Sequence, residues 1–297
     1  MPNISNFMRD VYPALEMSIF EKHKQYPPVY PNVTNVKPTT RWYEETQTKV
    51  GLGLYAQTAE QQNYAKDEIK PGFYTRTQLL KFTKMFSVSE DLIKFGKYEG
   101  LPEYTQDRGR KAGITMDVFA NAIYNNGFTA LQSDGVPLFS LSHPGYVGSG
   151  TTFGNVLAVQ ASLSYVSLNA VLSSMSTQVD ENGTLIYIRP RKLVYHPSNE
   201  LIASEILKST TRPDTANRAD NVLRGMLGGI EPVPNPYLLS PSMWFVLADM
   251  HFVNCYTYKG LEIRPERDPY NGDHLVFGSF YMSTGVGSPM GVFAGSA

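Results

Sequence analysis

The chain has 297 residues, of which 42% are hydrophobic and 18% charged, and this is enough for one large domain or two smaller ones with a proper core. The formal net charge of −1 disfavours tight nucleic-acid binding, because a protein that neutralises many phosphates carries a basic excess. The single cysteine, Cys255, rules out an intramolecular disulfide and cannot hold zinc by itself, and no apolar run reaches the roughly twenty residues that span a bilayer.

The first forty residues are predicted to form an arm. Residues 6–24 indicate an amphipathic helix, because apolar side chains recur there at near-helical spacing: Phe7, Val11, Leu15 and Ile19. The proline-rich stretch that follows, "QYPPVYPNVTNVKPTT", is incompatible with a helix and typical of extended, polyproline-like chain. We expect such an arm to lie on a neighbouring subunit rather than to close the core of its own chain.

A long hairpin is predicted next. Side chains alternate in "WYEETQTKVGLGLYAQT" and again in "GFYTRTQLLKFTKMFSV", and the two runs are joined by the polar stretch "AEQQNYAKDEI". A long two-stranded hairpin is marginally stable alone in water, so we expect it to need a partner surface. An ordinary hairpin that folds back on its own domain is the alternative.

Two helices are predicted after the hairpin. The stretch "SVSEDLIKFG" has a serine N-cap and acidic residues in its first turn, which favour a short helix. A longer helix is predicted over residues 103–126, because one face carries an apolar stripe made of Ala112, Met116, Phe119 and Ile123.

The second half of the chain mixes helices and strands. Helices are predicted in "SYVSLNAVLSSMSTQVDENG" and "SNELIASEILKS", a β-rich segment in "TLIYIRPRKLVYHP", and a buried strand in "SMWFVLAD". Residues 210–229 read as a polar exposed loop, and two strand-like runs follow residue 261. This order predicts an α+β fold rather than repeated βαβ units.

The stretch "DGVPLFSLSHPGYVGSGTTFGN" contains an acid, a base and candidate nucleophiles, namely Asp134, His143, Ser140, Ser142 and Ser149. It lacks the G-x-S-x-G spacing of a nucleophile elbow, and Asp-Gly and His-Pro are turn signatures. The five histidines are scattered, and neither a phosphate-binding nor a dinucleotide-binding glycine motif is present. We therefore interpret this stretch as a structural loop and assign no catalytic, metal or cofactor-binding residue.

The order of these parts resembles the major capsid protein family of tailed bacteriophages, whose fold is shared with encapsulin nanocompartments. The stretch "DGVPLFSLSHPG…TTFGN" looks like the D-G-x-x-L-F-S-x-x-H-P…N pattern that follows the long helix in the Mu-like head subunit branch. "IYIRPRKLVYHPSNELIASEIL" is similar to the strand–Pro–helix of the family's axial domain. "IRPERDPYNGDHLVFGSFYMSTGVGSPMGVF" is similar to the closing strands of its peripheral domain.

The resemblance implies the α+β fold of tailed-phage major capsid proteins. The expected division is an N-terminal arm (1–41), an extended β-hairpin loop (42–86), a peripheral domain with a spine helix (87–165), an axial domain (166–260) and return strands of the peripheral domain (261–297).

The function implied is that of a major capsid protein in the virion, without enzymatic activity. Copies would assemble in the host cytoplasm into pentamers and hexamers of an icosahedral shell around viral double-stranded DNA, held by weak non-specific contact. The resemblance also implies a portal, a decoration protein and, if Met1 is the native start, a separate scaffolding protein. The expected intersubunit contacts are made by polar and aromatic residues of the hairpin: Arg41, Trp42, Tyr43, Glu44, Tyr55, Phe73, Tyr74 and Arg76.

Two alternatives remain open at the level of sequence. An encapsulin-like nanocompartment would share the fold but enclose protein cargo, and a stand-alone Ser/His hydrolase would be a monomer. Some relatives crosslink subunits through a Lys–Asn isopeptide bond. Lysines in the hairpin do not establish such a bond, because any hydrophilic hairpin carries them, and no crosslink is assigned here.

Overall fold

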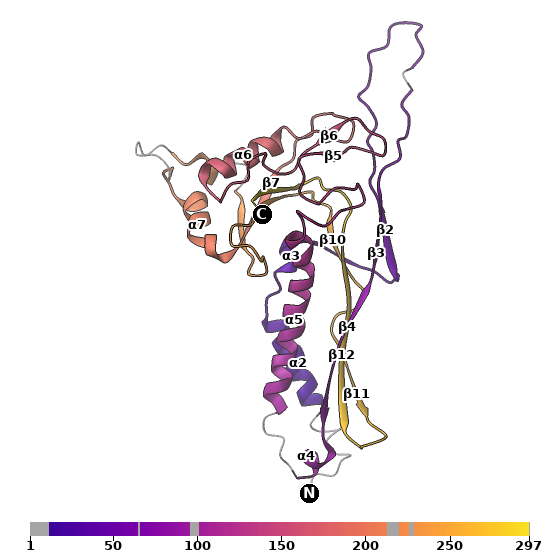
Figure 1. The fold of residues 1–297 in the computed structure, drawn as a ribbon, viewed down its shortest axis with the longest axis vertical. Coiled ribbons are helices and arrows are strands. Elements are labelled where there is room, and N and C mark those ends of the chain that lie inside the picture. The colour runs from indigo at the N-terminus through magenta and orange to yellow at the C-terminus, as the bar shows by residue number, and fades with distance from the viewer. Residues whose placement is uncertain (1–11, 65, 96–100, 213–219, 226–228, 297) are drawn as a thin grey trace.

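Figure 1 shows an elongated molecule, in which a rod of helices and long strands carries a second, broader unit at one end, and a loop projects beyond that unit. The computed structural model describes residues 12–64, 66–95, 101–212, 220–225 and 229–296. Helices and mostly antiparallel strands are mixed along the chain, so the predicted α+β class is confirmed. No helix within the described ranges is both long and apolar enough to cross a membrane.

The rod contains a five-stranded sheet built around its longest strand, β12. β4 pairs antiparallel with one edge of β12, β10 and β11 pair with the other, and β1 adds in parallel to β10. The five strands are β1 (Asn35–Pro38), β4 (Leu80–Val88), β10 (Val253–Thr257), β11 (Glu262–Arg267) and β12 (His274–Val286).

Helix α5 (Leu101–Asn125) covers one face of this sheet and confirms the predicted long helix. Its apolar stripe packs on the strands, with Met116 buried against the side chains of Phe280 and its neighbours. The Phe82 ring lies 4.9 Å from that of Phe119 and 5.0 Å from that of Phe280. Such aromatic pairs add roughly 0.5–1.5 kcal/mol beyond the area they bury.

The described part of the N-terminal arm packs on its own chain. Helix α2 (Tyr12–Gln25) lies along α5, and its Leu15 and Ile19 side chains are buried. A Cβ at Gly109 of α5 would overlap the carbonyl oxygen of Ile19, so glycine is what lets the two helices approach this closely. The expectation that this helix lies on a neighbouring subunit is therefore wrong, because α5 already covers its apolar stripe. Phe7 and Val11 lie outside the described residues.

The proline-rich stretch is not the polyproline strip that the sequence predicted. It contains a one-turn helix, α3 (Tyr30–Val33), which has Pro31 in its first turn, where the missing N–H costs nothing. The buried Asp117 accepts hydrogen bonds through Oδ1 from the backbone N–H groups of Val29 (2.9 Å) and Tyr30 (2.8 Å). β1 follows at the edge of the sheet, the position in which proline is tolerated.

The second unit is a four-stranded sheet in the order β13-β9-β7-β8, with two helices packed on it. Its largest fully buried side chain, Trp244, lies in β9, all of whose residues are buried, as predicted for that strand. The elements are α6 (Tyr165–Ser176), β7 (Pro190–Tyr195), α7 (Glu200–Lys208), β8 (Glu231–Pro234), β9 (Trp244–Ala248) and β13 (Val292–Ser296). Of the predicted polar loop 210–229, residues 213–219 and 226–228 lie outside the described ranges.

The two sheets do not follow the division that the resemblance implied. β10 comes from residues expected in the axial domain but pairs in the rod, and β13 comes from the expected return strands but pairs with β9 in the second sheet. Gly291 helps the chain cross between them. Its φ of +82° is a conformation that glycine adopts without strain, and a Cβ there would overlap the carbonyl oxygen of Met250.

The predicted hairpin exists but is shorter than expected. β2 (Tyr43–Gln47) and β3 (Tyr74–Gln78) pair antiparallel over five residues, and the described residues between them form no strand. β4, expected to be part of the hairpin, instead joins the sheet of the rod. Hereafter residues 48–73 are called the projecting loop, which rises above the second unit in Figure 1.

The remaining elements are short. Helix α4 (Glu90–Lys94) is preceded by Ser89, whose Oγ accepts a hydrogen bond from the N–H of Leu92 (3.2 Å), which confirms a serine N-cap. The stretch that begins at Asp134 forms a small ribbon, and two 3₁₀ turns flank α7. The strands of the ribbon are β5 (His143–Pro144) and β6 (Thr152–Phe153), and the 3₁₀ turns are Pro197–Asn199 and Val222–Arg224.

Candidate functional site

The acid and the base of the Asp134 stretch meet in the interior. His143 Nδ1 lies 2.6 Å from Asp134 Oδ2, and the two side chains are 0% and 5% exposed. Gly135, with φ of +83°, makes the turn after Asp134, and the N–H of Val136 donates to Asp134 Oδ1 at 3.2 Å. The Asp-Gly pair is thus a turn, as predicted, and also the source of a buried carboxylate that sequence reasoning did not assign.

The other side of the imidazole contacts an amide instead of a nucleophile. His143 Nε2 lies 3.2 Å from Asn155 Oδ1, which also accepts a hydrogen bond from the N–H of Ser140. The Asn155 amide donates through Nδ2 to the carbonyl oxygens of Leu138 and Pro289, which fixes its orientation. Because Asn155 Oδ1 can only accept, His143 donates to it through Nε2, and His143 Nδ1 is hydrogen-bonded to Asp134 Oδ2.

Two of the three candidate nucleophiles, Ser140 and Ser149, form hydrogen bonds through their hydroxyl groups with the backbone of the same stretch. Ser140 Oγ accepts a hydrogen bond from the N–H of Ser142 (3.2 Å), and Ser149 Oγ accepts one from the N–H of Thr151 (2.9 Å). A hydrolytic triad needs the nucleophile at the imidazole nitrogen that does not face the acid. Because Asn155 occupies that position, the cluster is a structural joint, as the sequence predicted, although Asn155 itself was not singled out.

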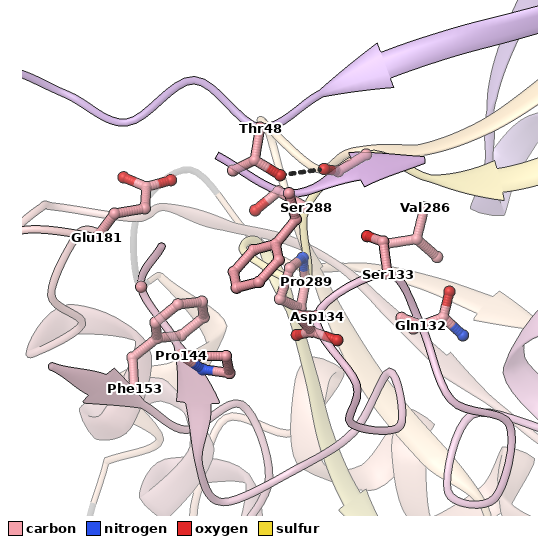
Figure 2. Close-up of a pocket in the computed structure, with 13 residues that line it drawn as sticks. Thr48, Gln132, Ser133, Asp134, Pro144, Phe153, Glu181, Val286, Ser288 and Pro289 are labelled. Carbon is pink, nitrogen blue, oxygen red and sulfur yellow. Dashed lines mark hydrogen bonds between the residues drawn. The ribbon is translucent and has the colours of Figure 1, made fainter. Parts of the chain in front are cut away.

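Figure 2 shows the small cavity beside this cluster. It has a volume of about 20 Å³, which is room for roughly one water molecule and not for a substrate. Thr48, at the start of the projecting loop, donates through Oγ1 to the carbonyl oxygen of Gly287 (3.0 Å) at its rim. Glu181 lines the cavity from the side of the second unit, and burial raises the pKa of its carboxyl group. The cavity thus marks the place where the projecting loop, the Asp134 stretch and both units meet.

No metal site accompanies this junction. Across the part of the chain that the structure describes, no three His, Cys, Asp or Glu side chains are grouped so that they could hold an ion. Cys255 is buried in the rod, where burial raises the pKa of its thiol to about 12, so it packs as an apolar side chain.

The projecting loop exposes apolar side chains far from either core. Tyr55, Tyr64 and Ile69 are 106%, 90% and 91% exposed, and Leu52 and Leu54 are also exposed. Of these, sequence analysis had singled out only Tyr55. Large exposed apolar side chains concentrated in one segment are typical of interaction surfaces in folded proteins. These residues could be identified only from the structure, because only the structure shows that the described part of the loop that carries them forms no strand.

The expected contact residues at the base of the hairpin fall into two groups. On the exposed face, the guanidinium carbon of Arg76 lies 3.8 Å from the centre of the Tyr43 ring, and Tyr74 stands on the same face. Trp42 and Arg41, just before β2, are exposed as well. The inward group is Glu44 and Phe73.

These two inward residues serve the chain's own fold. Glu44 accepts a hydrogen bond from the hydroxyl of Thr39, and Phe73 lines the small cavity. They are thus committed inside the subunit, whereas Arg41, Trp42, Tyr43, Tyr55, Tyr74 and Arg76 stay available to another molecule. Contact with a second subunit stays a prediction for all eight.

Comparison with known proteins supplies the family. A family model described as "Phage capsid protein" matches residues 73–295, which is well over half of the chain. A comparison with curated proteins finds no match to this sequence.

Solved structures show the same fold at low sequence identity. The capsid of the cyanophage P-SCSP1u is 12% identical with a TM-score of 0.58, covering 91% of this chain and 88% of that chain. The virus-like particle from Pyrococcus furiosus is 12% identical with a TM-score of 0.53, covering 96% and 99%. The procapsid of bacteriophage JBD30 is 14% identical with a TM-score of 0.51, covering 97% and 75%.

Proposed function

This chain belongs to the phage capsid protein family, and we propose that its copies assemble into pentamers and hexamers of an icosahedral shell that encloses viral double-stranded DNA. It is a structural shell protein rather than an enzyme, and the His143 cluster, which holds an amide where a nucleophile would be needed, agrees with this.

The exposed projecting loop is the observation that carries the proposal. Its apolar side chains have no core of their own to enter, and each stabilises the protein only when a surface outside the subunit covers it. Burial of apolar surface contributes roughly 25 cal/mol per Å². A neighbouring copy of the chain supplies such a surface at every position of a closed shell, so that one modest contact is repeated around each symmetry axis.

The base of the hairpin adds a second contact on the same side of the molecule. Arg76 is held over the Tyr43 ring and lies 3.8 Å from the Glu45 carboxylate, so its guanidinium is already ordered before another subunit arrives. An exposed ion pair contributes only about 0–1 kcal/mol by itself. Its role in the shell is therefore to orient the contact, while the apolar loop provides most of the affinity.

The remaining partners follow from the same proposal. A net charge of −1 favours confinement of DNA by a closed wall with weak, non-specific contacts over tight binding. Assembly in the host cytoplasm would use a separate scaffolding protein, and a portal and a decoration protein would complete the particle. The polar segment 210–229 would lie near a capsomer axis.

Deletion of residues 59–67 at the loop tip, together with serine in place of Tyr55 and Ile69, tests the role of the loop. We expect a folded subunit with an unchanged circular dichroism spectrum that forms no shells by negative-stain electron microscopy. The matched control replaces the polar residues Glu60–Gln62 by Gly-Ser-Gly, which leaves the apolar side chains in place and should preserve assembly. Intact shells from the first variant would contradict the proposed role of the projecting loop.

The contents of the shell test the second half of the proposal. Particles purified from cells that produce the complete phage should protect DNA from added nuclease. A defined protein cargo in place of DNA would instead identify an encapsulin-like compartment, and a monomer by light scattering at all concentrations would overturn the shell altogether.

A further inference from the structure

One side chain of the second unit contacts both limbs of the projecting loop. Asn182 lies in the turn between α6 and β7, and its Nδ2 donates to the carbonyl oxygen of Gly51 in the outgoing limb. Its Oδ1 accepts a hydrogen bond from Lys70 Nζ in the returning limb at 3.1 Å. A single amide therefore links the two limbs to each other and to the body of the protein.

The turn that presents Asn182 is rigid. Asp180 Oδ1 accepts hydrogen bonds from the N–H groups of Asn182 (2.9 Å) and Thr184 (2.8 Å), and the N–H of Asp180 donates to the carbonyl of Thr184 (2.8 Å). Gly183, with φ of +84°, completes the turn without strain. The turn thus fixes the backbone of Asn182, and with it the place from which the side-chain amide reaches the loop.

A second segment, which contains Tyr146 and Val147, contacts the returning limb at Lys70 and Pro71, next to Asn182. Lys70 Nζ lies 4.5 Å from the centre of the Tyr146 ring, within the range of a cation–π interaction, and the N–H of Val147 donates to the carbonyl of Pro71 (3.2 Å). Tyr146 follows Gly145, at which a Cβ would overlap the carbonyl oxygen of Glu181. The segment that carries Tyr146 therefore packs directly on the turn that carries Asn182.

We propose that Asn182 and Tyr146 form a clamp within the subunit that fixes the direction of the projecting loop before it contacts another copy. Both are positioning residues, because they act on the loop rather than on the neighbouring subunit. The inference rests on the proposed function, in which the loop is covered by a neighbour. A loop that is already held in its bound direction loses less conformational freedom on association, so assembly begins at a lower subunit concentration.

The expected size of the effect follows from the two hydrogen bonds that Asn182 makes to the loop. Each such bond contributes about 1 kcal/mol, so removal of both raises the subunit concentration needed for half-maximal assembly by up to roughly thirtyfold. The distribution of loop directions in the free subunit broadens at the same time.

Asn182→Ala in the full chain tests the clamp, with Asn199→Ala as the matched control. The control also removes an asparagine side chain that bonds to a backbone carbonyl, that of Pro241, at a site away from the loop. Spin labels at Gln61 and on the exposed Tyr270 report the distance distribution in dissociated subunits, and light scattering reports assembly. We expect a broader distribution, and an assembly concentration higher by up to roughly thirtyfold, for Asn182→Ala alone.

Identical distance distributions and assembly curves for the two variants would overturn the clamp. If Asn182→Ala lowers the melting temperature, Asn182→Asp repeats the test on a folded chain, because aspartate retains the acceptor for Lys70 and loses the donor to Gly51. The tip deletion separates this inference from the proposed function. A subunit that stays monomeric at all concentrations would refute the function itself, and shells formed without the tip would refute the intersubunit role of the loop, on which the clamp depends. Loss of shells in the deletion with no effect of Asn182→Ala would refute only the clamp.

Discussion

His143 Nδ1 and Asp134 Oδ2 lie 2.6 Å apart, both side chains are buried, and Asn155 Oδ1 lies at the other imidazole nitrogen. This arrangement joins three parts of the chain. The amide of Asn155 reaches the carbonyl of Pro289 near the end of the chain, so the stretch after α5 is tied to the crossing between the two sheets. Asp134 and His143, which resemble a catalytic acid–base pair, therefore stabilise the contact between these segments of the chain.

Replacement of Asp134 tests its hydrogen bond to His143. Asp134→Ala leaves His143 Nδ1 buried without a partner and should lower the free energy of unfolding by about 2–4 kcal/mol in urea titrations. Asp134→Asn should cost clearly less, because the amide donates to Nδ1 while its oxygen still accepts from Val136. Ser142→Ala, at an exposed neighbour, should change stability by under about 0.5 kcal/mol. Equal losses for Ala and Asn would contradict a stabilising hydrogen bond at His143 Nδ1.

The burial of Ile19 gives a test of the corrected position of the arm. Ile19→Ala should destabilise the dissociated subunit by about 2–4 kcal/mol, because the side chain is 1% exposed within its own chain. Met17→Ala, two residues away and 63% exposed, serves as the control and should be nearly neutral. If Ile19→Ala affected only assembled shells and left the isolated subunit unchanged, the arm would lie on a neighbour after all.

Gly145 supports the clamp through backbone packing. Gly145→Ala should lower the free energy of unfolding by about 1–3 kcal/mol, because the added methyl group overlaps the carbonyl oxygen of Glu181 and forces two backbones apart. Gly150→Ala provides a control in the same stretch, since nothing lies within 4 Å of its added Cβ. Thermal melts of both variants check this. Equal melting temperatures would show that the turn at Glu181 shifts away from the added methyl group without a loss of stability.

His251 should make stability depend on pH. Burial, and secondarily the positive charge of Lys192, lowers the pKa of this imidazole to about 4 from its ordinary 6.5. Between these values the unfolded chain binds a proton at His251 and the folded chain does not, so the free energy of unfolding falls as the pH decreases from 6.5 towards 4. The loss is on the order of 2–3 kcal/mol at the acid end of this window.

The variant His251→Gln isolates this contribution from those of carboxylates that titrate in the same range. Urea titrations at several pH values should show a shallower acid-side fall for the variant than for the original protein, and the two slopes should agree above pH 7. Parallel curves over the whole range would mean that His251 carries the same protonation in the folded and unfolded states.

Local patterns were enough to predict most elements. Helix periodicity, strand burial and capping depend on residues that are close in sequence. Each could therefore be predicted from a single segment, as shown by the apolar stripe on α5, the buried residues of β9 and the serine N-cap of α4. The resemblance in the order of these elements also identified the family before any coordinates, and the family comparison confirms it.

The positions of the loop and of the arm needed the tertiary structure. The alternating side chains of residues 72–88 predicted strands. Only the pairing with the distant β12 shows that β4 belongs to the sheet of the rod and not to the hairpin. An apolar stripe on α2 indicated that something must cover it, and the closeness of Gly109 decided that α5 does so. The Asn182 contacts likewise join residues more than a hundred positions apart.

The sequence alone therefore determined most of the helical, extended and polar segments of this protein, because those properties follow largely from neighbouring residues, and the order of the segments determined which family it resembles. The tertiary structure decided which apolar surfaces are satisfied within the subunit and which stay exposed on the projecting loop. That distinction depends on contacts between segments far apart in the chain, and periodicity, which is a local quantity, carries no information about the partner that buries a surface.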